Sequence, residues 1–306
     1  MNLPETQRKA SLPNFIIAGA AKCGTTSMDD ILKDHPDIYL PLEKELHFFD
    51  NDDFYAQGKQ FYQKFYAKHS GEKAIGDITP AYMIFPEVPA RMKETLGEDL
   101  KIIFSLRNPM ERAFSDYINL FKLGFIVETD FMEAVEKETS HKDQLSYIDR
   151  IYYSLIERSM YAKYLVHYFE AFPCNNFHFI LFEEDFLNNK SATFEQLQQF
   201  IGVKPENLDV NLKSNKAELP RFRHLNRLLF HPGPVQSVLK IPAKLIPTRK
   251  IKKAIKDGIK KVNVKEGAVP KLSPELKAEL YHRFFSEDID QLESMIGRDL
   301  SGWKVN

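Results

Sequence analysis

The sequence predicts an α/β fold in which three layers are built around a central, mainly parallel β-sheet flanked by helices. Two observations predict it. Short apolar runs, typical of buried strands, alternate along the chain with longer segments whose apolar residues recur at helical spacing. A glycine-rich segment also stands between the first apolar run and the first helical segment. Such alternation is typical of parallel sheets covered by helices.

Four segments are predicted to be strands. The first runs from Asn14 to Gly19 (NFIIAG) and ends in glycine. Residues 101–106 (KIIFSL) and 178–182 (HFILF) are further apolar runs, and 73–77 (KAIGD) is a weaker candidate. Continuous apolar runs of this length are expected where both faces of a strand are buried.

Helices are predicted from the apolar spacing between these runs. After the first strand, apolar positions recur at i, i+3, i+4 and i+7, and His35-Pro36 closes this helix. These positions are Met28, Ile31, Leu32 and His35. Pro109 can open another helix from its first turn. Further helices are expected over 155–172 and 193–201, the second capped by Gly202.

The length of 306 residues fits one large domain. We expect a single domain over 13–303, after a disordered N-terminus at 1–12. Within the domain, residues 203–272 are proline-punctuated and basic, and we expect an irregular insertion or lid there. The tail 273–303 is predicted to be helical, with Ser273 as N-cap and Pro274 at the first helical position.

Charge is unevenly distributed. The formal net charge is −1, so global charge predicts no nucleic-acid partner. From Lys240 to Lys271, however, eleven Lys or Arg stand against two acids. A solvated face that covers the core, a site for an anionic glycan and a peripheral membrane contact through 240–271 are the three interpretations of this stretch.

Cysteine content and hydropathy indicate the cellular compartment in which the protein is expected. Two cysteines, Cys23 and Cys174, make no disulfide framework, so a reducing environment is favoured. The first twelve residues lack the apolar run of a signal peptide, and no window has 18 apolar residues. We therefore expect a soluble, cytoplasmic protein without a membrane span.

A candidate phosphate loop follows the first predicted strand, which makes the expected domain P-loop-like. It reads Gly19-Ala-Ala-Lys22-Cys23-Gly24-Thr25-Thr26-Ser27. Backbone N–H groups at a helix start face a bound anion, and the helix dipole favours negative charge there. The glycines allow a tight turn and the hydroxyls add donors. An ordinary glycine-rich turn is the alternative.

The lysine of this loop is not where nucleotide triphosphatases carry it. Their pattern is G-x-x-x-x-G-K-[ST], but here Thr25 follows Gly24 and Lys22 stands two places earlier. Those enzymes also hold Mg²⁺ through an acid at a strand end, whereas Arg107 follows the strand 101–106. The sequence therefore favours phosphate binding without metal. A small-molecule kinase and a non-catalytic nucleotide-binding protein remain alternatives.

Arg107 and Ser115 are further candidate binding residues. Arg107 follows a predicted strand directly, at the end where ligands bind in open α/β sheets. Ser115 lies on the next helix, on one face with Arg112. Together they can hold one phosphate, although each taken alone is equally consistent with a surface residue.

Glu45 and His47 lie in a segment, Glu43 to Asp50 (EKELHFFD), that runs from charged residues into two phenylalanines. We expect these polar groups at the wall of a hydrophobic cleft. A carboxylate there can have a raised pKa and serve as a base near neutral pH. The alternatives are a surface acid for Glu45 and a structural histidine for His47.

Together the three segments resemble the heparan sulfate sulfotransferase group and its bacterial relatives. Residues 20–27 (AAKCGTTS) resemble the 5′-phosphosulfate loop of that family, and 107–117 (RNPMERAFSDY) its 3′-phosphate motif. Residues 45–50 (ELHFFD) resemble the segment that carries its catalytic glutamate. With weaker matches elsewhere, the resemblance covers residues 13–303.

The resemblance implies a sulfotransferase that uses 3′-phosphoadenosine-5′-phosphosulfate (PAPS), releases adenosine 3′,5′-bisphosphate, needs no metal and acts on a carbohydrate. It implies that the loop, with Lys22, binds the phosphosulfate and that Arg107 and Ser115 hold the 3′-phosphate. Glu45 would act as the base, and His47 would orient it or contact the acceptor. Lys216 and Arg221 could close over the donor as a basic lid, with an ordinary solvated loop as the alternative.

The chain departs from the family at three places. The Golgi members carry an N-terminal membrane anchor, which we do not expect here, and residues 203–272 resemble them poorly. Some members have a lysine where Ile78 stands, so a cation near the leaving group is missing at this position. The donor is therefore a safer expectation than the acceptor.

Overall fold

The computed structural model describes residues 12–140, 146–211, 219–220, 264–265 and 270–305. The chain divides into two compact units. The first comprises 1–112, 158–214 and 278–306, and the second 113–157 and 215–277, each without its undescribed residues. The predicted extent of a single domain, 13–303, stays a prediction. No helix among the described residues combines the length and apolar character that a membrane span requires.

A five-stranded parallel sheet forms the centre of the first unit. Its spatial order is β2-β3-β1-β4-β5, and every neighbouring pair is parallel. The strands are β1 (Phe15–Gly19), β2 (Ile38–Tyr39), β3 (Ala74–Ile78), β4 (Lys101–Leu106) and β5 (Phe177–Leu181). The four predicted strands are confirmed to within one residue at each end, and β2 is additional.

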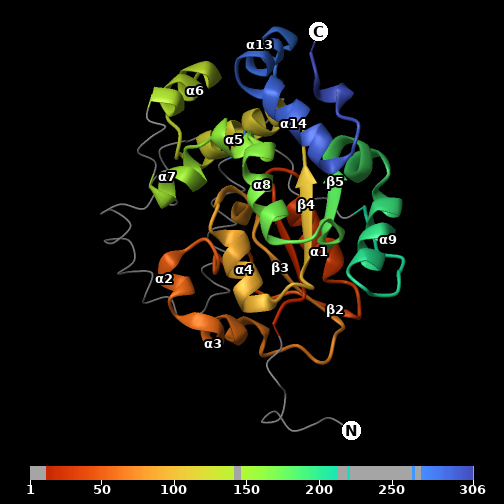
Figure 1. The fold of residues 1–306 in the computed structure, drawn as a ribbon. Helices are drawn as coiled ribbons and strands as arrows, with labels where there is room; N and C mark the ends of the chain where they lie inside the picture. The colour runs from red at the N-terminus through yellow and green to blue at the C-terminus, as the bar shows by residue number, and fades with distance from the viewer. Residues whose placement is uncertain (1–11, 141–145, 212–218, 221–263, 266–269, 306) are drawn as a thin grey trace. The chain divides into compact units, whose positions relative to one another are not determined.

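Helices cover both faces of this sheet, which confirms the predicted three-layer α/β class (Figure 1). On one face, α1 (Thr25–Leu32) and α9 (Lys190–Phe200) share a buried apolar cluster with alternate strand residues such as Ile103. On the other face, α8 (Tyr161–Ala171) packs on the sheet, with the rings of Phe104 and Tyr168 4.9 Å apart. Helix α4 (Val88–Leu96) contacts α8.

The shorter elements of the first unit connect these layers. They are α2 (Asp52–Tyr55), α3 (Gly58–Gln63), 3₁₀ turns at Lys64–Tyr66 and Pro80–Ile84, and a π-helix at Phe182–Asn188. Near the C-terminus, α13 (Pro274–Leu280) begins in the second unit and ends in the first, and a π-helical turn (Tyr281–Phe285) and α14 (Ser286–Ile296) of the first unit follow it. The buried Asp288 carboxylate of α14 accepts the backbone N–H groups of Ala162 and Lys163, so α14 caps the start of α8.

Helices dominate the described part of the second unit. It contains most of α5 (Pro109–Leu123), α6 (Phe131–Ser140) and α7 (Tyr147–Tyr152), and β6 (Leu219–Pro220) pairs antiparallel with β7 (Val264–Lys265). The buried Glu138 carboxylate accepts the backbone N–H groups of Leu155, Ile156 and Glu157. The helix predicted over 155–172 begins only at Tyr161, as α8, after a 3₁₀ turn at Glu157–Ser159.

Other helix ends also differ from prediction. The first helix ends at Leu32 rather than His35, whose ring accepts the Asp37 amide and bonds the Lys204 carbonyl instead. Helix α9 begins before the predicted residue 193. The Ser273 cap is confirmed, because its hydroxyl accepts the Leu276 amide. The predicted disordered N-terminus and most of 203–272 lie outside the described residues.

Candidate active site

Four neighbouring strands direct their carboxyl ends to one edge of the sheet. Parallel strands end on the same side, where ligands bind in α/β folds. Strand β1 leads into the candidate phosphate loop, β2 leads toward Glu45, β3 into Thr79, and β4 into Arg107. The topology therefore gathers the three sequence motifs, apart from Ser115, along this edge.

The phosphate loop, residues 20–24, is anchored to β4. The Ala20 amide donates to the Ser105 carbonyl at 2.7 Å, and the Ser105 hydroxyl donates to the Cys23 carbonyl at 2.7 Å. Lys22 (φ 72°) and Gly24 (φ 85°) both have left-handed backbone conformations. Helix α1 starts directly afterwards, and the first amides of a helix have no partner within it. The loop thus has the donors that an anion site requires.

Gly24 is required at its position by packing as well as by backbone conformation. A Cβ atom there would lie 3.0 Å from the Phe186 ring and 3.1 Å from the Phe182 ring. These rings stack with centroids 5.4 Å apart in the π-helical segment. The aromatic pair therefore covers the C-terminal end of the loop.

The remaining loop side chains differ in what they can offer a ligand. Thr26 is exposed and Lys22 is half-buried, whereas Thr25 and Ser27 are buried. Cys23 is fully buried, and burial raises the pKa of its thiol to about 11. The thiol is therefore neutral at pH 7, so Cys23 can serve the loop through its backbone and packing only.

Arg107 lies next to this loop. Its carbonyl accepts the Tyr161 hydroxyl at 2.8 Å, and that hydroxyl is 4.0 Å from the Cys23 sulfur. The guanidinium is 5.3 Å from the Phe182 ring centroid and 3.6 Å from the carboxylates of both Glu111 and Glu183. Its Nε is buried and has no hydrogen-bond partner among the described residues. Arg107 therefore retains a buried donor.

Three further residues are predicted to bind the donor. Ser115 is half-buried on α5, in the second unit. Lys216 and Arg221 lie outside the described residues, as does most of the basic stretch 240–271. The predicted roles of these residues stay predictions.

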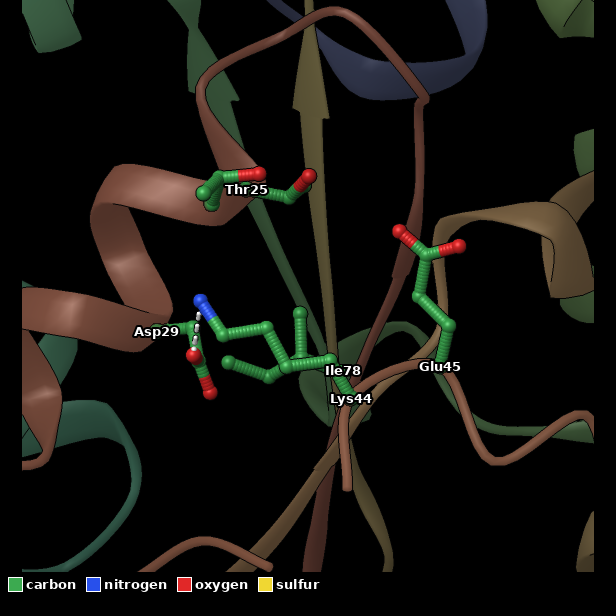
Figure 2. Close-up of a pocket in the computed structure, with 6 residues that line it drawn as sticks. Thr25, Asp29, Lys44, Glu45 and Ile78 are labelled. Atoms are coloured by element: carbon green, nitrogen blue, oxygen red, sulfur yellow. Dashed lines mark ion pairs between the residues drawn. The ribbon is translucent and has the colours of Figure 1, made fainter. Parts of the chain in front are cut away.

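Glu45 lines a small pocket at the start of α1. The lining residues are Thr25, Thr26, Asp29, Lys44, Glu45 and Ile78. Figure 2 shows that the adjacent side chains of Lys44 and Glu45 diverge, with Lys44 directed to Asp29. Lys44 pairs with Asp29, and its Nζ is 2.9 Å from Asp30 Oδ1. Some family members have a lysine at the position of Ile78. Here Lys44 places a cation in the pocket that Ile78 lines.

The expected apolar surroundings of Glu45 are not found. Its side chain is 57% exposed, whereas Phe48 and Phe49 are buried in an aromatic cluster. The phenylalanines turn into the core and leave the carboxylate at the pocket mouth. Proximity to two phenylalanines in sequence is therefore a poor guide to the burial of Glu45.

His47 lies between two carboxylates. Its Nδ1 is 2.8 Å from Asp50 Oδ2, and its Nε2 is 3.9 Å from Glu45 Oε2. Burial acts to lower the pKa of His47, but the hydrogen bond to Asp50 and the charges of Asp50 and Glu45 outweigh it, so the pKa is raised. The charged imidazolium is thus favoured beside Glu45.

Sequence reasoning missed several residues of this site. Asp50 and Lys44 stand within the EKELHFFD segment, so their position was a usable signal. Asp50 contacts His47 of the same segment, whereas Lys44 pairs with Asp29 and Asp30 of α1. Asp77, whose contacts hold this segment, has no motif to mark it. Within the described parts of the chain, no group of three or more His, Cys, Asp or Glu residues is arranged to hold a metal ion.

Comparison with known proteins decides the family. The profile of the sulfotransferase domain family matches residues 12–227, which is more than half of the chain. The chain belongs to the sulfotransferase domain family. The family is thus the one predicted from the three motifs, and the enzyme class predicted from the sequence is confirmed at this level.

Curated sulfotransferases with similar sequences include enzymes of heparan sulfate. Heparan sulfate glucosamine 3-O-sulfotransferase 5 of Mus musculus is 29% identical over 212 residues, covering 67% of this chain and 57% of its own. Heparan sulfate glucosamine 3-O-sulfotransferase 3B1 of Homo sapiens is 29% identical over 207 residues, covering 68% and 50%. The chain thus spans about half the length of these relatives.

A solved sulfotransferase structure matches nearly the whole chain. The sulfotransferase from Alicyclobacillus acidocaldarius is 27% identical, covers 96% of this chain and 99% of its own, and superposes with a TM-score of 0.68. The parallel sheet with its strand-end loops is therefore the sulfotransferase fold, and the predicted P-loop-like class is confirmed.

Proposed function

We propose that this sulfotransferase transfers a sulfuryl group from PAPS to a hydroxyl or amine of an acceptor, and that the acceptor is a carbohydrate. The observation that carries the proposal is the placement of an anion-binding loop, Arg107 and a candidate base, Glu45, at one sheet edge. The glucosamine-directed names of the similar curated enzymes support the acceptor class.

The residues of this edge fit an anionic donor. The loop offers the Lys22 ammonium and the first amides of α1, and Arg107 adds a buried Nε that has no hydrogen-bond partner among the described residues. All of these groups donate hydrogen bonds, as phosphate and sulfate oxygens require. PAPS supplies the sulfuryl group and a good leaving group, adenosine 3′,5′-bisphosphate. In our proposal Arg107, with Ser115, holds the 3′-phosphate.

The chain's own groups then have separate roles. Glu45 takes the proton of the acceptor hydroxyl as the new oxygen–sulfur bond forms and the bond to the leaving phosphate oxygen breaks. Lys22 stabilises the negative charge that develops on that phosphate, as a fixed cation beside a backbone cradle does. His47, hydrogen-bonded to Asp50, orients Glu45. No residue in this scheme acts as a metal ligand.

Ligand-induced thermal shifts test the donor class. Any ligand that binds only the folded state raises the melting temperature with its concentration. We expect adenosine 3′,5′-bisphosphate, without Mg²⁺, to stabilise the protein more than AMP, ADP or ATP, because only it carries a 3′-phosphate for Arg107. The preference should disappear in Arg107→Ala. Equal stabilisation by ATP–Mg²⁺ would overturn the proposal and support a phosphoryl-transfer enzyme.

A further inference from the structure

The buried carboxylate of Asp77 is linked by hydrogen bonds to the segment that carries Glu45. Asp77, on β3, is 1% exposed and accepts three hydroxyl hydrogen bonds. Tyr62 donates to Oδ2 at 2.7 Å, Tyr82 donates to Oδ2 at 2.9 Å, and Thr79 donates to Oδ1 at 2.7 Å. An ionised carboxylate can only accept, so its three partners must each give it their single proton.

Two of these three hydroxyls also accept hydrogen bonds from the backbone of the Glu45 segment, residues 43–50. The Leu46 amide donates to Thr79 Oγ1 at 3.0 Å, and the Phe48 amide donates to the Tyr82 hydroxyl at 3.1 Å. Because each hydroxyl proton is committed to Asp77, the lone pairs of the hydroxyl oxygens are left to accept these amides. Asp77 thus fixes the direction of two hydrogen bonds that hold the segment.

The backbone of this segment requires such support. Glu45 (φ 54°) and His47 (φ 52°) both have left-handed conformations, which cost residues other than glycine on the order of 1–3 kcal/mol each. Such conformations persist where the surroundings over-determine them. The two hydrogen-bonded amides, of Leu46 and Phe48, alternate with the two left-handed residues. Each hydroxyl therefore holds the segment directly beside a candidate catalytic side chain.

We propose that Asp77, Thr79 and Tyr82 are positioning residues that fix the orientation of Glu45 and His47 through the Leu46 and Phe48 amides. This inference rests on the proposed function of Glu45. Asp77 itself is buried and acts through the two hydroxyls rather than on substrate. A misplacement of about 1 Å at a reacting group can cost roughly 100-fold in rate, so a small relaxation of the segment is sufficient to reduce turnover.

Tyr62 provides a matched control for the test. Tyr62→Phe and Tyr82→Phe each remove one hydroxyl hydrogen bond to the same oxygen, Asp77 Oδ2, and each keeps its aromatic ring. Among the described residues, only the Tyr82 hydroxyl of this pair accepts an amide of the Glu45 segment. A purely structural role predicts similar effects of the two variants, whereas a positioning role predicts different ones.

The experiment measures kcat, the Kd of adenosine 3′,5′-bisphosphate and amide hydrogen exchange across residues 43–50 in each folded variant. We expect Tyr82→Phe and Thr79→Val to lower kcat by roughly 10- to 100-fold with unchanged Kd, and to accelerate exchange at Phe48 and Leu46 respectively. Thr79→Ser, which keeps the hydroxyl, should restore both readouts. Tyr62→Phe should leave both close to wild type.

Two outcomes would overturn the positioning role. One is an equal loss of kcat in Tyr62→Phe and Tyr82→Phe, and the other is unchanged exchange at Leu46 in Thr79→Val. Hydrogen exchange needs no turnover, so it tests the network independently of the reaction. A wild-type protein that transfers no sulfuryl group would contradict the proposed function, while the exchange pattern would still test whether the hydroxyls hold the segment.

Discussion

Lys22 shows how a single residue separates this site from that of a nucleotide triphosphatase. It stands inside the loop, two places before Gly24, in a left-handed conformation at φ 72°. A lysine after Gly24 would instead occupy the first turn of α1, where Thr25 stands and is buried. Lys22 is therefore the one side-chain cation that the loop 20–24 contains.

Substitution of Lys22 should abolish most transfer while leaving the fold intact. Lys22→Ala removes the charge opposite the leaving phosphate, and loss of one such electrostatic group costs roughly 10²–10³-fold in kcat. Lys22→Arg should restore little, because a planar guanidinium does not replace a compact ammonium beside a backbone cradle. Turnover with saturating PAPS is the measurement.

The control for Lys22 is Lys73→Ala. Lys73 is exposed and precedes β3, at the opposite edge of the sheet from the loop. Its removal deletes an ion pair with Asp37 and should leave turnover unchanged. Near-normal turnover in Lys22→Ala would mean that the loop does not bind the reacting end of the donor.

Residue-level prediction from the sequence worked where chemistry is carried by a local motif. Lys22, Arg107 and Glu45 were recognised from their neighbours in sequence, and all three lie at the same sheet edge. Asp77 was not recognised, because its proposed positioning role depends on hydrogen bonds from the Tyr62 and Tyr82 hydroxyls, which only the folded chain brings together. The apolar surroundings expected for Glu45 were not found, because Phe48 and Phe49 turn into the core.

At the scale of elements, continuous apolar runs were the reliable signal. Strands β1 and β4 are buried on both faces, so their sequences are apolar almost throughout and their positions could be predicted; β5, which is partly exposed, also has an apolar run. Strand β2 has two residues and leaves no such pattern. Helix α8 begins later than predicted: a 3₁₀ turn occupies Glu157–Ser159, and Glu138 accepts the backbone N–H groups of residues 155–157. That tertiary contact cannot be read from periodicity.

Strand β3 packs so closely against its neighbours that a side chain at Gly76 should destabilise the fold. Gly76 faces Phe15 and Leu40, and a Cβ atom there would lie 2.2 Å from Phe15 Cζ. Phe15 is fully buried and cannot move aside easily. We expect Gly76→Ala to lower the free energy of unfolding by about 1–3 kcal/mol, the usual cost of overpacking a core. Urea unfolding measures the change.

Gly302→Ala, in the 3₁₀ turn Ser301–Trp303, is the control for Gly76→Ala. A Cβ atom at Gly302 would meet no other atom within 4 Å, so the same chemical change should have little effect there. Equal unfolding midpoints for Gly76→Ala and Gly302→Ala would show that β3 does not pack against β1 as described. Because β3 carries Asp77 and leads into Thr79, this packing also supports the network beneath Glu45.

At the scale of the molecule, the strand order explains how distant segments form one site. Strands β2, β3, β1 and β4 are adjacent and parallel, so residues from Lys22 to Arg107 meet at their carboxyl ends. The sequence predicted this edge, because α/β alternation implies it. The acceptor could not be predicted in the same way, since no motif of the sequence identifies it and most of 203–272 lies outside the described residues.

In the proposed site, Arg107 holds the donor and Glu45 accepts the proton. Comparing kcat and donor Kd between Glu45→Gln and Arg107→Ala tests these separate roles. Glu45→Gln keeps shape but cannot take a proton, so kcat for sulfuryl transfer from PAPS to a glucosamine-containing oligosaccharide should fall roughly 10²–10⁴-fold, with donor Kd unchanged. Arg107→Ala should instead weaken donor binding by on the order of 1.5–3 kcal/mol per lost charged hydrogen bond, with a smaller fall in kcat at saturating donor. Wild-type kcat in Glu45→Gln, or wild-type donor Kd in Arg107→Ala, would contradict the account.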